Sequence, residues 1–492
     1  MMNIRFFFAC CLLTLPGAKV FSQRNSPTVS NQPATIIQQL GTAFVQEKSH
    51  VGLSIGIIRN GKTSFYNFGT TEKGKHELPT QQTIYEIGSI SKTFGGLLLA
   101  RAVVDKRVRL EDDIRQYLDG DYPNLAFKGQ PIRLVNLTNW TSELPDNFPD
   151  KPDAYKQANP DSIPFLIVNR LQNYTRQDFF NDLHNVTLQA APGQNPRHSN
   201  VAAQLLGYIL EKIYQKPFEE LIATQIEQPL AMRSTFGSPQ PADLFAIGYS
   251  GNGVQMPAFT LKAMQAAGGL RYSAADLLKY AAYQLEERDP AVKISHQPTW
   301  GSPDSQAFGL NWFLHKTIAS KRRIEHSGGT FGFASYCDLY PDQKTALVLF
   351  ANNSDQSTQG QLGELSSKIM DALFGKPAAL TALNAELEKQ GFAQALAVVK
   401  AVRKKHPELF LSEEYVNIWG YTLAGQGKLN EALEIFKLNV SLYPKGYNTY
   451  DSLAETYDRL GNKVLAIKNY RQSLALNPGN TNAIEYLKKA GE

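Results

Sequence analysis

The chain has 492 residues, which is too long for one compact core and predicts two or three domains. Apolar residues make up 42% and charged residues 19%, a balance that excludes a largely disordered chain. The formal net charge of +5 is spread along the chain without a long basic run, which argues against a nucleic-acid partner.

The first residues have the pattern of a secretory signal. Arg5 gives a positive start, residues 6–15 form an apolar core, and Ser22 is a small residue before a cleavage point. We therefore expect residues 1–22 to be a signal peptide and the protein to be exported, to the periplasm or the medium. The two cysteines of this segment lie inside the apolar core rather than at its end, which disfavours a lipoprotein. No later apolar run is as long, so we expect no transmembrane segment in the mature chain.

Residues 23–34 are polar and contain proline, which predicts a tether before an amphipathic helix near 35–47. Two strand-like runs follow, joined at Asn60-Gly61, and this dipeptide is the strongest short signal for a β-hairpin. Residues 95–290 mostly follow helical patterns, broken by loops rich in proline and asparagine.

From Phe308 the pattern changes to strands, in FGLNWFL, KRRIEHSG, GFASYCDLY and TALVLFANN, and a helix near 360–373 closes the region. Strands at both ends with helices between them predict an α+β domain over residues 35–375. We expect an antiparallel sheet flanked by helices, completed by the two ends of the domain, with a helical lobe inserted. Cys337 is the one cysteine after the signal, so no internal disulfide is expected, and its strand position predicts a buried, inert thiol.

The last hundred residues repeat with a period of 34. Four pairs of similar residues share this spacing: Gly427 and Gly461, Ala432 and Ala466, Phe436 and Tyr470, Pro444 and Pro478. A helix-turn-helix unit of this period resembles the tetratricopeptide repeat. We therefore expect a linker at 376–381 and an all-α repeat domain at 382–492, with a degenerate first helix pair and a terminal capping helix. Such a domain is a candidate site for a protein partner.

The segment EIGSISKTF places Ser89 and Lys92 three residues apart, just before an apolar run. At the start of a helix these positions share one face, and the helix N-terminus favours developing negative charge. A serine hydroxyl is a poor nucleophile until a base takes its proton, and a desolvated lysine amine can take it. The alternative is an ordinary helix start, in which Ser89 is the N-cap and Lys92 is solvated.

Three motifs in order along residues 35–375 resemble the serine β-lactamase and penicillin-binding-protein superfamily, in particular class C β-lactamase-like serine hydrolases and D,D-peptidases. They read TIYEIGSISKTF, PGQNPRHSNVAAQLLGYILEKI and RRIEHSGGTFGFASY. The resemblance implies that Ser89 is the acylated nucleophile and Lys92 its activating partner. It also implies an oxyanion hole made by the backbone N–H groups of Ser89 and Gly329.

The second and third motifs supply the remaining candidates. The resemblance implies that Asn200, Ser327 and Gly328 bind the substrate, and that His326 takes the place of the family's third-motif lysine. Because Gly328 and Gly329 have no side chain, the strand edge there also allows a substrate backbone to approach. The alternative for His326 is a strand histidine that only satisfies a local hydrogen bond.

The chain departs from the family pattern in two places. His198 stands where the family usually has tyrosine, and an imidazole can shuttle a proton because its unperturbed pKa is about 6.5. The alternative is a histidine that only fills the tyrosine's space. In the LTNWTSELP loop, Trp140 and Glu143 replace the family's usual histidine and glycine, and we interpret both as changes that reshape the pocket rim.

The sequence therefore predicts an exported serine hydrolase that forms an acyl-enzyme on a small-molecule or peptide substrate with an amide or ester bond, of the D,D-peptidase, β-lactamase or esterase type. The second hypothesis is a catalytically inactive penicillin-fold sensor or scaffold, whose repeats bind a protein partner. We expect no metal and no other cofactor, because the eight histidines lack ligand spacing and no phosphate-binding glycine loop is present.

Overall fold

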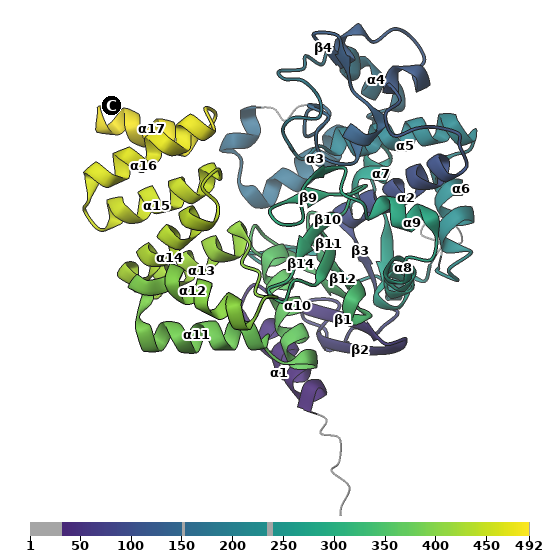
Figure 1. Ribbon diagram of the computed structural model, residues 1–492. Coiled ribbons are helices and arrows are strands. Elements are labelled where there is room, and N and C mark those ends of the chain that lie inside the picture. The colour runs from purple at the N-terminus through teal and green to yellow at the C-terminus, as the bar shows by residue number, and fades with distance from the viewer. Residues whose placement is uncertain (1–31, 150–152, 234–239, 492) are drawn as a thin grey trace, which may run out of the picture.

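The computed structural model describes residues 32–149, 153–233 and 240–491 (Figure 1). The predicted signal peptide at 1–22 and most of the predicted tether lie outside the described residues. None of the helices within those three ranges combines the length and apolar character that a membrane crossing requires. The first helix, α1, spans Gln32–Gln46, so it begins three residues inside the segment predicted as a tether.

One antiparallel sheet organises the first two thirds of the chain, with eight strands in the order β2-β1-β13-β12-β11-β10-β9-β8. In chain order these strands are β1 (Gly52–Arg59), β2 (Lys62–Gly69), β8 (Trp300–Gly301), β9 (Ala307–Phe308), β10 (Phe313–Lys316), β11 (Arg322–Gly329), β12 (Ala334–Tyr340) and β13 (Thr345–Ala351). The pairing of β1 with β13 confirms that early and late parts of the domain complete one sheet. The FGLNWFL segment is not one strand, because it is divided between β9 and β10.

The hairpin at Asn60-Gly61 forms as predicted. Both residues have positive φ, 50° and 79°, which is the backbone geometry of a tight two-residue turn between antiparallel strands. The strands that it joins, β1 and β2, are in register from Gly52–Gly69 to Arg59–Lys62.

Helices cover both faces of the central strands. α1 and α10 (Thr358–Phe374) pack together on one face, and α8 (Ala274–Glu286) lies against β1, β12 and β13 on the other. Every residue of β12 and β13 is therefore buried, which explains why these strands read as continuous apolar runs rather than an alternating pattern.

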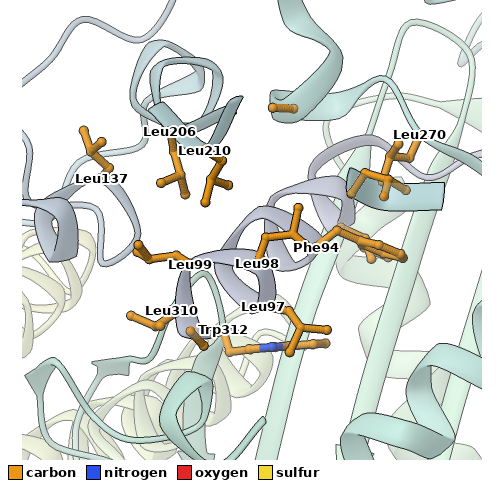
Figure 2. Close-up of a cluster of buried hydrophobic side chains, with 14 of the residues drawn as sticks. Phe94, Leu97, Leu98, Leu99, Leu137, Leu206, Leu210, Leu270, Leu310 and Trp312 are labelled. Atoms are coloured by element: carbon orange, nitrogen blue, oxygen red, sulfur yellow. The ribbon is translucent and has the colours of Figure 1, made fainter. Parts of the chain in front are cut away.

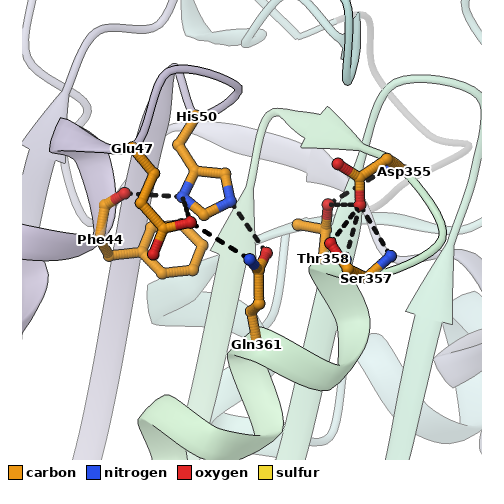
Figure 3. Close-up of polar contacts among 7 residues, drawn as sticks. All are labelled: Phe44, Glu47, His50, Asp355, Ser357, Thr358 and Gln361. Atoms are coloured by element: carbon orange, nitrogen blue, oxygen red, sulfur yellow. Dashed lines mark hydrogen bonds and ion pairs between the residues drawn. The ribbon is translucent and has the colours of Figure 1, made fainter. Parts of the chain in front are cut away.

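Side-chain hydrogen bonds fasten α1 to α10 (Figure 3). The His50 ring stacks on Phe44 with centroids 3.9 Å apart, and its Nδ1 lies 2.6 Å from the Phe44 carbonyl oxygen. On the other side of the ring, Nε2 lies 3.0 Å from Oε1 of Gln361 on α10. Asp355 accepts from the backbone N–H groups of Ser357 and Thr358 and so caps the start of α10.

A helical lobe is inserted between β2 and β8, as predicted. Its helices are α2 (Ser91–Val104), α3 (Ile163–Leu171), α4 (Arg176–His184), α5 (Asn200–Tyr214), α6 (Phe218–Ile222), α7 (Gln265–Gly268), α8 and α9 (Pro290–Ser295). Short strand pairs β3 (Ile84–Glu86) with β7 (Arg271–Ser273), β4 (Ala126–Phe127) with β5 (Gln130–Pro131), and β6 (Tyr249–Ser250) with β14 (Asn353–Ser354) tie its connections together.

The central helix of the lobe is α2, and it is surrounded by apolar side chains (Figure 2). Leu97, Leu98 and Leu99 are fully buried among residues of α5 and of the segment before β10, including Leu206, Leu210, Leu310 and Trp312. Because three successive leucines point to different sides of a helix, α2 has no polar face through its middle. The helix is thus held rigidly, and with it the residues at its N-terminus.

The last part of the chain is a region of seven helices, coloured green to yellow in Figure 1: α11 (Ala378–Gln390), α12 (Ala395–Lys405), α13 (Glu413–Gly425), α14 (Leu429–Leu442), α15 (Tyr447–Arg459), α16 (Lys463–Leu476) and α17 (Thr481–Ala490). Consecutive helices pack in pairs around two apolar clusters that are separate from those of the sheet. Since α11 begins at Ala378, most of the segment predicted as a linker, 376–381, is already helical.

This helical region contacts the sheet at the turn between β10 and β11. Phe410 donates its backbone N–H to the Ile318 carbonyl at 2.9 Å, and Ser320 donates its hydroxyl to the Glu408 carbonyl at 2.8 Å. The Ile318 side chain also packs against the apolar core of the helical region. The hairpin that leads into β11 is therefore supported from outside the α+β domain.

Candidate active site

Ser89 and Lys92 are in direct contact. Ser89 lies in a 3-10 turn, Gly88–Ile90, immediately before α2, and its Oγ is 2.7 Å from the Lys92 Nζ. Lys92 is 2% exposed and also donates to the Ala267 carbonyl at 2.8 Å. The helix cap of α2 is Ile90, without a side-chain hydrogen bond. The alternative of a serine N-cap with a solvated lysine is therefore wrong.

Burial changes the protonation of Lys92. Loss of water around the ammonium lowers the pKa of Lys92 to about 7, although the negative charge of Asp146 opposes this shift. Near neutral pH a large share of Lys92 is thus the free amine. In that form Nζ accepts the Ser89 hydroxyl proton instead of donating to it.

Close backbone contacts join the serine turn to the end of β11. Gly88 has a φ of 51°, and a Cβ placed on it would lie 2.6 Å from the Gly329 nitrogen. A Cβ on Gly328 would lie 2.0 Å from the Ile87 carbonyl oxygen. These glycines are needed because any side chain would force the strand and the turn apart. Gly328, predicted to bind substrate, packs its backbone against Ile87 and is not among the residues that line the cavity.

The turn before α5 brings His198 and Asn200 to the site. Ser199 caps α5 by accepting the Ala202 N–H at 3.0 Å, and Asn200 is the first helical residue. The Asn200 side chain donates to Oδ1 of Asn147 at 2.9 Å. His198 has its Nδ1 2.5 Å from Oδ1 of Asp146.

Asp146 and Asn147 are site residues that the sequence analysis missed. They follow Pro145 in the 140–147 loop and meet a turn about fifty positions further along the chain. No local pattern in ELPDN marks this contact, because it depends on the loop's path rather than on residue spacing. Their polarity directly after the LTNWTSELP loop was the one available signal.

His326 is buried beside the reactive pair, with 2% exposure. Its Nδ1 lies 2.5 Å from the Ser327 carbonyl oxygen, which can only accept, so Nδ1 carries the proton. Burial first, and then the charge of Lys92, lower the pKa of His326 to about 3. The ring is thus neutral at ordinary pH, and its Nε2 is a buried acceptor to which the described residues give no partner.

These residues surround one cavity of about 480 Å³. Six of the predicted site residues line it: Ser89, His198, Asn200, His326, Ser327 and Gly329. The remaining wall is largely apolar and aromatic, and includes Trp140, Phe148, Ile167, Leu171, Phe259, Phe313 and Phe331. Described residues between Trp140 and Leu171 contribute much of this wall, whereas the 235–260 segment contributes Phe259.

The two loop departures have different outcomes. Trp140 lines the cavity, and its ring stacks on Phe308 and meets the edge of His198 at 5.2 Å. Glu143 is buried and is not among the lining residues, so any effect that it has on the rim comes through the path of the loop. Both have positive φ, 68° and 62°, a conformation in which the loop turns sharply toward the 197–200 segment.

Other reactive groups do not form a second site in the described part of the chain. Cys337 lies fully buried in β12, and burial raises the pKa of its thiol, so it remains the inert cysteine that the sequence predicts. Within the described ranges, no group of three His, Cys, Asp or Glu side chains is arranged to hold a metal ion.

The family model described as Beta-lactamase matches residues 37–364, two thirds of the chain. The chain belongs to the beta-lactamase family. This membership supports a serine hydrolase of the penicillin-binding fold. The helices from α11 onward lie outside the matched residues.

Curated relatives are distant. Protein flp of Staphylococcus aureus strain N315 is 27% identical over 341 residues, covering 66% of this chain and 64% of that protein. A beta-lactamase of Pseudomonas fluorescens is 25% identical over 369 residues, covering 65% of this chain and 95% of that protein. The chain thus spans less than two thirds of the flp protein that it matches.

Solved structures agree on the fold. A class C beta-lactamase superposes with a TM-score of 0.59 at 21% identity, covering 71% of this chain and 99% of its own. A beta-lactamase/D-alanine carboxypeptidase from Pseudomonas syringae gives 0.56 at 21% identity, over 70% and 99%. At these identities the likeness shows the fold alone.

The lowered pKa of Lys92 predicts that the reactivity of Ser89 depends on pH. Below pH 7 the ammonium cannot take the hydroxyl proton, so the rate of labelling by a fluorophosphonate should rise with a midpoint near pH 7 and level off above pH 8. The measurement is the second-order labelling rate between pH 5 and 9. In His198→Phe the same midpoint should persist, whereas a rate independent of pH would contradict the assignment.

Proposed function

We propose that this chain is an exported serine hydrolase that acts through an acyl-enzyme on Ser89, with an amide or ester substrate such as a D-amino-acid peptide, a β-lactam or a small ester. The observation that carries the proposal is the 2.7 Å contact between Ser89 Oγ and the desolvated Lys92 Nζ at the wall of the cavity. Export rests on the pattern of residues 1–22 alone.

In the acylation step, Lys92 as free amine takes the Ser89 proton while Oγ forms a bond to the substrate carbonyl carbon. The backbone N–H groups of Ser89 and Gly329 are the proposed donors to the oxyanion. The tight packing of Gly88 against Gly329 supports this role, because it holds the two amides at the same end of the cavity.

The leaving group must receive a proton when its bond to the carbonyl carbon breaks. His198 is the proposed carrier: its ring takes from Lys92 the proton that Ser89 gave up and passes it to the leaving oxygen or nitrogen, so Lys92 and His198 both return to their starting state. Asn200 is the proposed hydrogen-bond partner of the substrate amide or carbonyl. Its position at the start of α5, in the cavity wall, supports that role.

The cavity supports a substrate with one hydrogen-bond donor and one apolar group. Neutral His326 offers an acceptor nitrogen rather than a positive charge, so the substrate group that meets it is an N–H or O–H donor. The aromatic wall accepts the apolar group. The desolvated lysine, and the hydrogen bond between His198 and Asp146, also favour a reactive centre over the alternative of an inactive scaffold.

Covalent labelling tests the proposal. A fluorescent penicillin or a fluorophosphonate should add one acyl or phosphonyl group to the full chain, and Ser89→Ala should abolish the adduct. The measurement is intact mass with mapping of the labelled peptide. The exposed Ser367→Ala on α10 is the control and should label normally. No adduct from a panel of such probes, or an adduct that persists in Ser89→Ala, would refute the proposal.

The role of His198 is tested separately. His198→Phe should lose turnover by about 10²–10⁴-fold, the usual contribution of a proton-transfer residue. His198→Tyr should retain part of it, because a phenol also carries a proton. The measurement is pre-steady-state hydrolysis of a chromogenic ester, which separates acylation from deacylation. Unchanged rates for both steps in His198→Phe would exclude the role.

We also infer that the helical region is a tetratricopeptide-like array. Its helices support this: α13 and α15 begin 34 residues apart, as do α14 and α16, and α17 begins 34 residues after α15. Ala432 and Ala466 are fully buried at equivalent positions. The small side chain lets paired helices approach closely.

If the two helix pairs are equivalent repeat units, substitutions of Ala432 and Ala466 should reduce stability to a similar extent. Ala432→Leu and Ala466→Leu should each destabilise the helical region by about 1–3 kcal/mol, because the added atoms have no space. Val464→Leu, at a residue 78% exposed on α16, is the control and should be neutral. The measurement is urea unfolding followed by circular dichroism. Tolerance of leucine at one alanine but not the other would contradict the repeat.

A further inference from the structure

A contribution to the stability of the fold does not explain the contact between His198 and Asp146. The two side chains are 36% and 55% exposed, and a polar contact so open to water contributes little to stability. Nevertheless the Nδ1–Oδ1 distance is 2.5 Å, which is short for a charge-assisted hydrogen bond. Both residues line the cavity that contains Ser89.

The backbone on both sides fixes this contact. Asp146 accepts the Asn200 N–H on its carbonyl at 2.8 Å, and the neighbouring Pro145 carbonyl accepts the Ser199 hydroxyl at 2.6 Å. At the other end of the loop, the Trp140 carbonyl accepts the Arg197 N–H at 2.6 Å. These three hydrogen bonds hold the backbone on both sides of His198 against the 140–146 loop. Main-chain hydrogen bonds therefore hold the Asp146 carboxylate next to Nδ1 of the His198 ring.

The hydrogen-bond partner of Nδ1 determines which ring nitrogen of neutral His198 carries the proton. A carboxylate oxygen only accepts, so Nδ1 carries a proton and the neutral ring has its lone pair on Nε2. The T-shaped packing of Trp140 against the ring restricts its rotation. We propose that Asp146 is a positioning residue that holds His198 in this tautomer, so that His198 and Asp146 together replace the family's tyrosine. The inference rests on the proposed acyl-enzyme at Ser89.

In deacylation this pair would act as follows. A water oxygen bonds to the acyl carbonyl carbon while one of its protons passes to Nε2 of His198. The oxyanion then collapses, the bond between the carbon and Ser89 Oγ breaks, and Oγ takes the proton back from Nε2. The products are a free acid and the original serine. Asp146 stays ionised throughout and stabilises the imidazolium that forms between the two transfers.

Asp146 also affects Lys92, and the test must distinguish this effect from the effect of Asp146 on His198. Its negative charge raises the pKa of Lys92, against the larger effect of burial. The other charged or titratable side chains that line the cavity are Tyr155, Arg170 and His326. If Asp146 worked through Lys92 alone, its removal would matter whether or not residue 198 were a histidine.

A double-mutant cycle on the full chain distinguishes these roles. Asp146→Asn should lower kcat for a chromogenic ester by about 100-fold or more with little change in KM, because the amide no longer holds the required tautomer. In the His198→Phe background the same substitution should change kcat by less than about twofold. Asp119→Asn removes an exposed carboxylate that is 2.7 Å from Lys212, and this control should retain full turnover.

The inference is overturned if Asp146→Asn turns over like the unsubstituted chain, or if it loses as much in the His198→Phe background. Should Asp146→Asn not fold, as judged by its thermal unfolding, Asp146→Ala replaces it, and turnover restored by formate supports the pairing whereas no restoration overturns it. Failure of the proposed function looks different, since the unsubstituted chain would then not be labelled at Ser89 at all.

Discussion

The desolvated contact between Lys92 and Ser89 is the interaction on which the rest of the site depends. α2 is surrounded by packed side chains, so the lysine in its first turn is almost fully buried and lies against a serine hydroxyl and a carbonyl oxygen. An ammonium in such a place is costly, and the lysine responds by losing affinity for its proton. Burial of Lys92 thus places a free amine, which can act as a base, next to the nucleophilic hydroxyl of Ser89.

The remaining site residues come from the sheet and from the lobe. β11 brings His326 and Gly329 to the serine turn, and close glycine packing lets the strand end and the turn touch. The lobe brings His198 and Asn200 from the opposite wall. The hairpin before β11 is held by the C-terminal helices, so the position of the strand depends on both parts of the chain.

Short sequence patterns predicted the features that depend on residues close together in the chain. The Asn60-Gly61 hairpin, the buried strands and the Ser89–Lys92 pair follow from short-range periodicity, and the sequence placed them correctly. The Asp146 contact could not be predicted, because it requires positive φ at Trp140, a conformation that side-chain-bearing residues rarely adopt. The neutral state of His326 was equally hidden, since it comes from burial among residues distant in sequence.

The most direct test of this account is the protonation of Lys92 itself. Lysine ε-¹³C NMR of the full chain, titrated from pH 5 to 11 and assigned with Lys92→Arg, reports that group without any assumption about substrate. The account predicts a resonance that titrates with a pKa of about 7 and is missing from Lys92→Arg. If every lysine titrates near the ordinary value of about 10.4, Lys92 is a solvated ammonium and cannot activate Ser89.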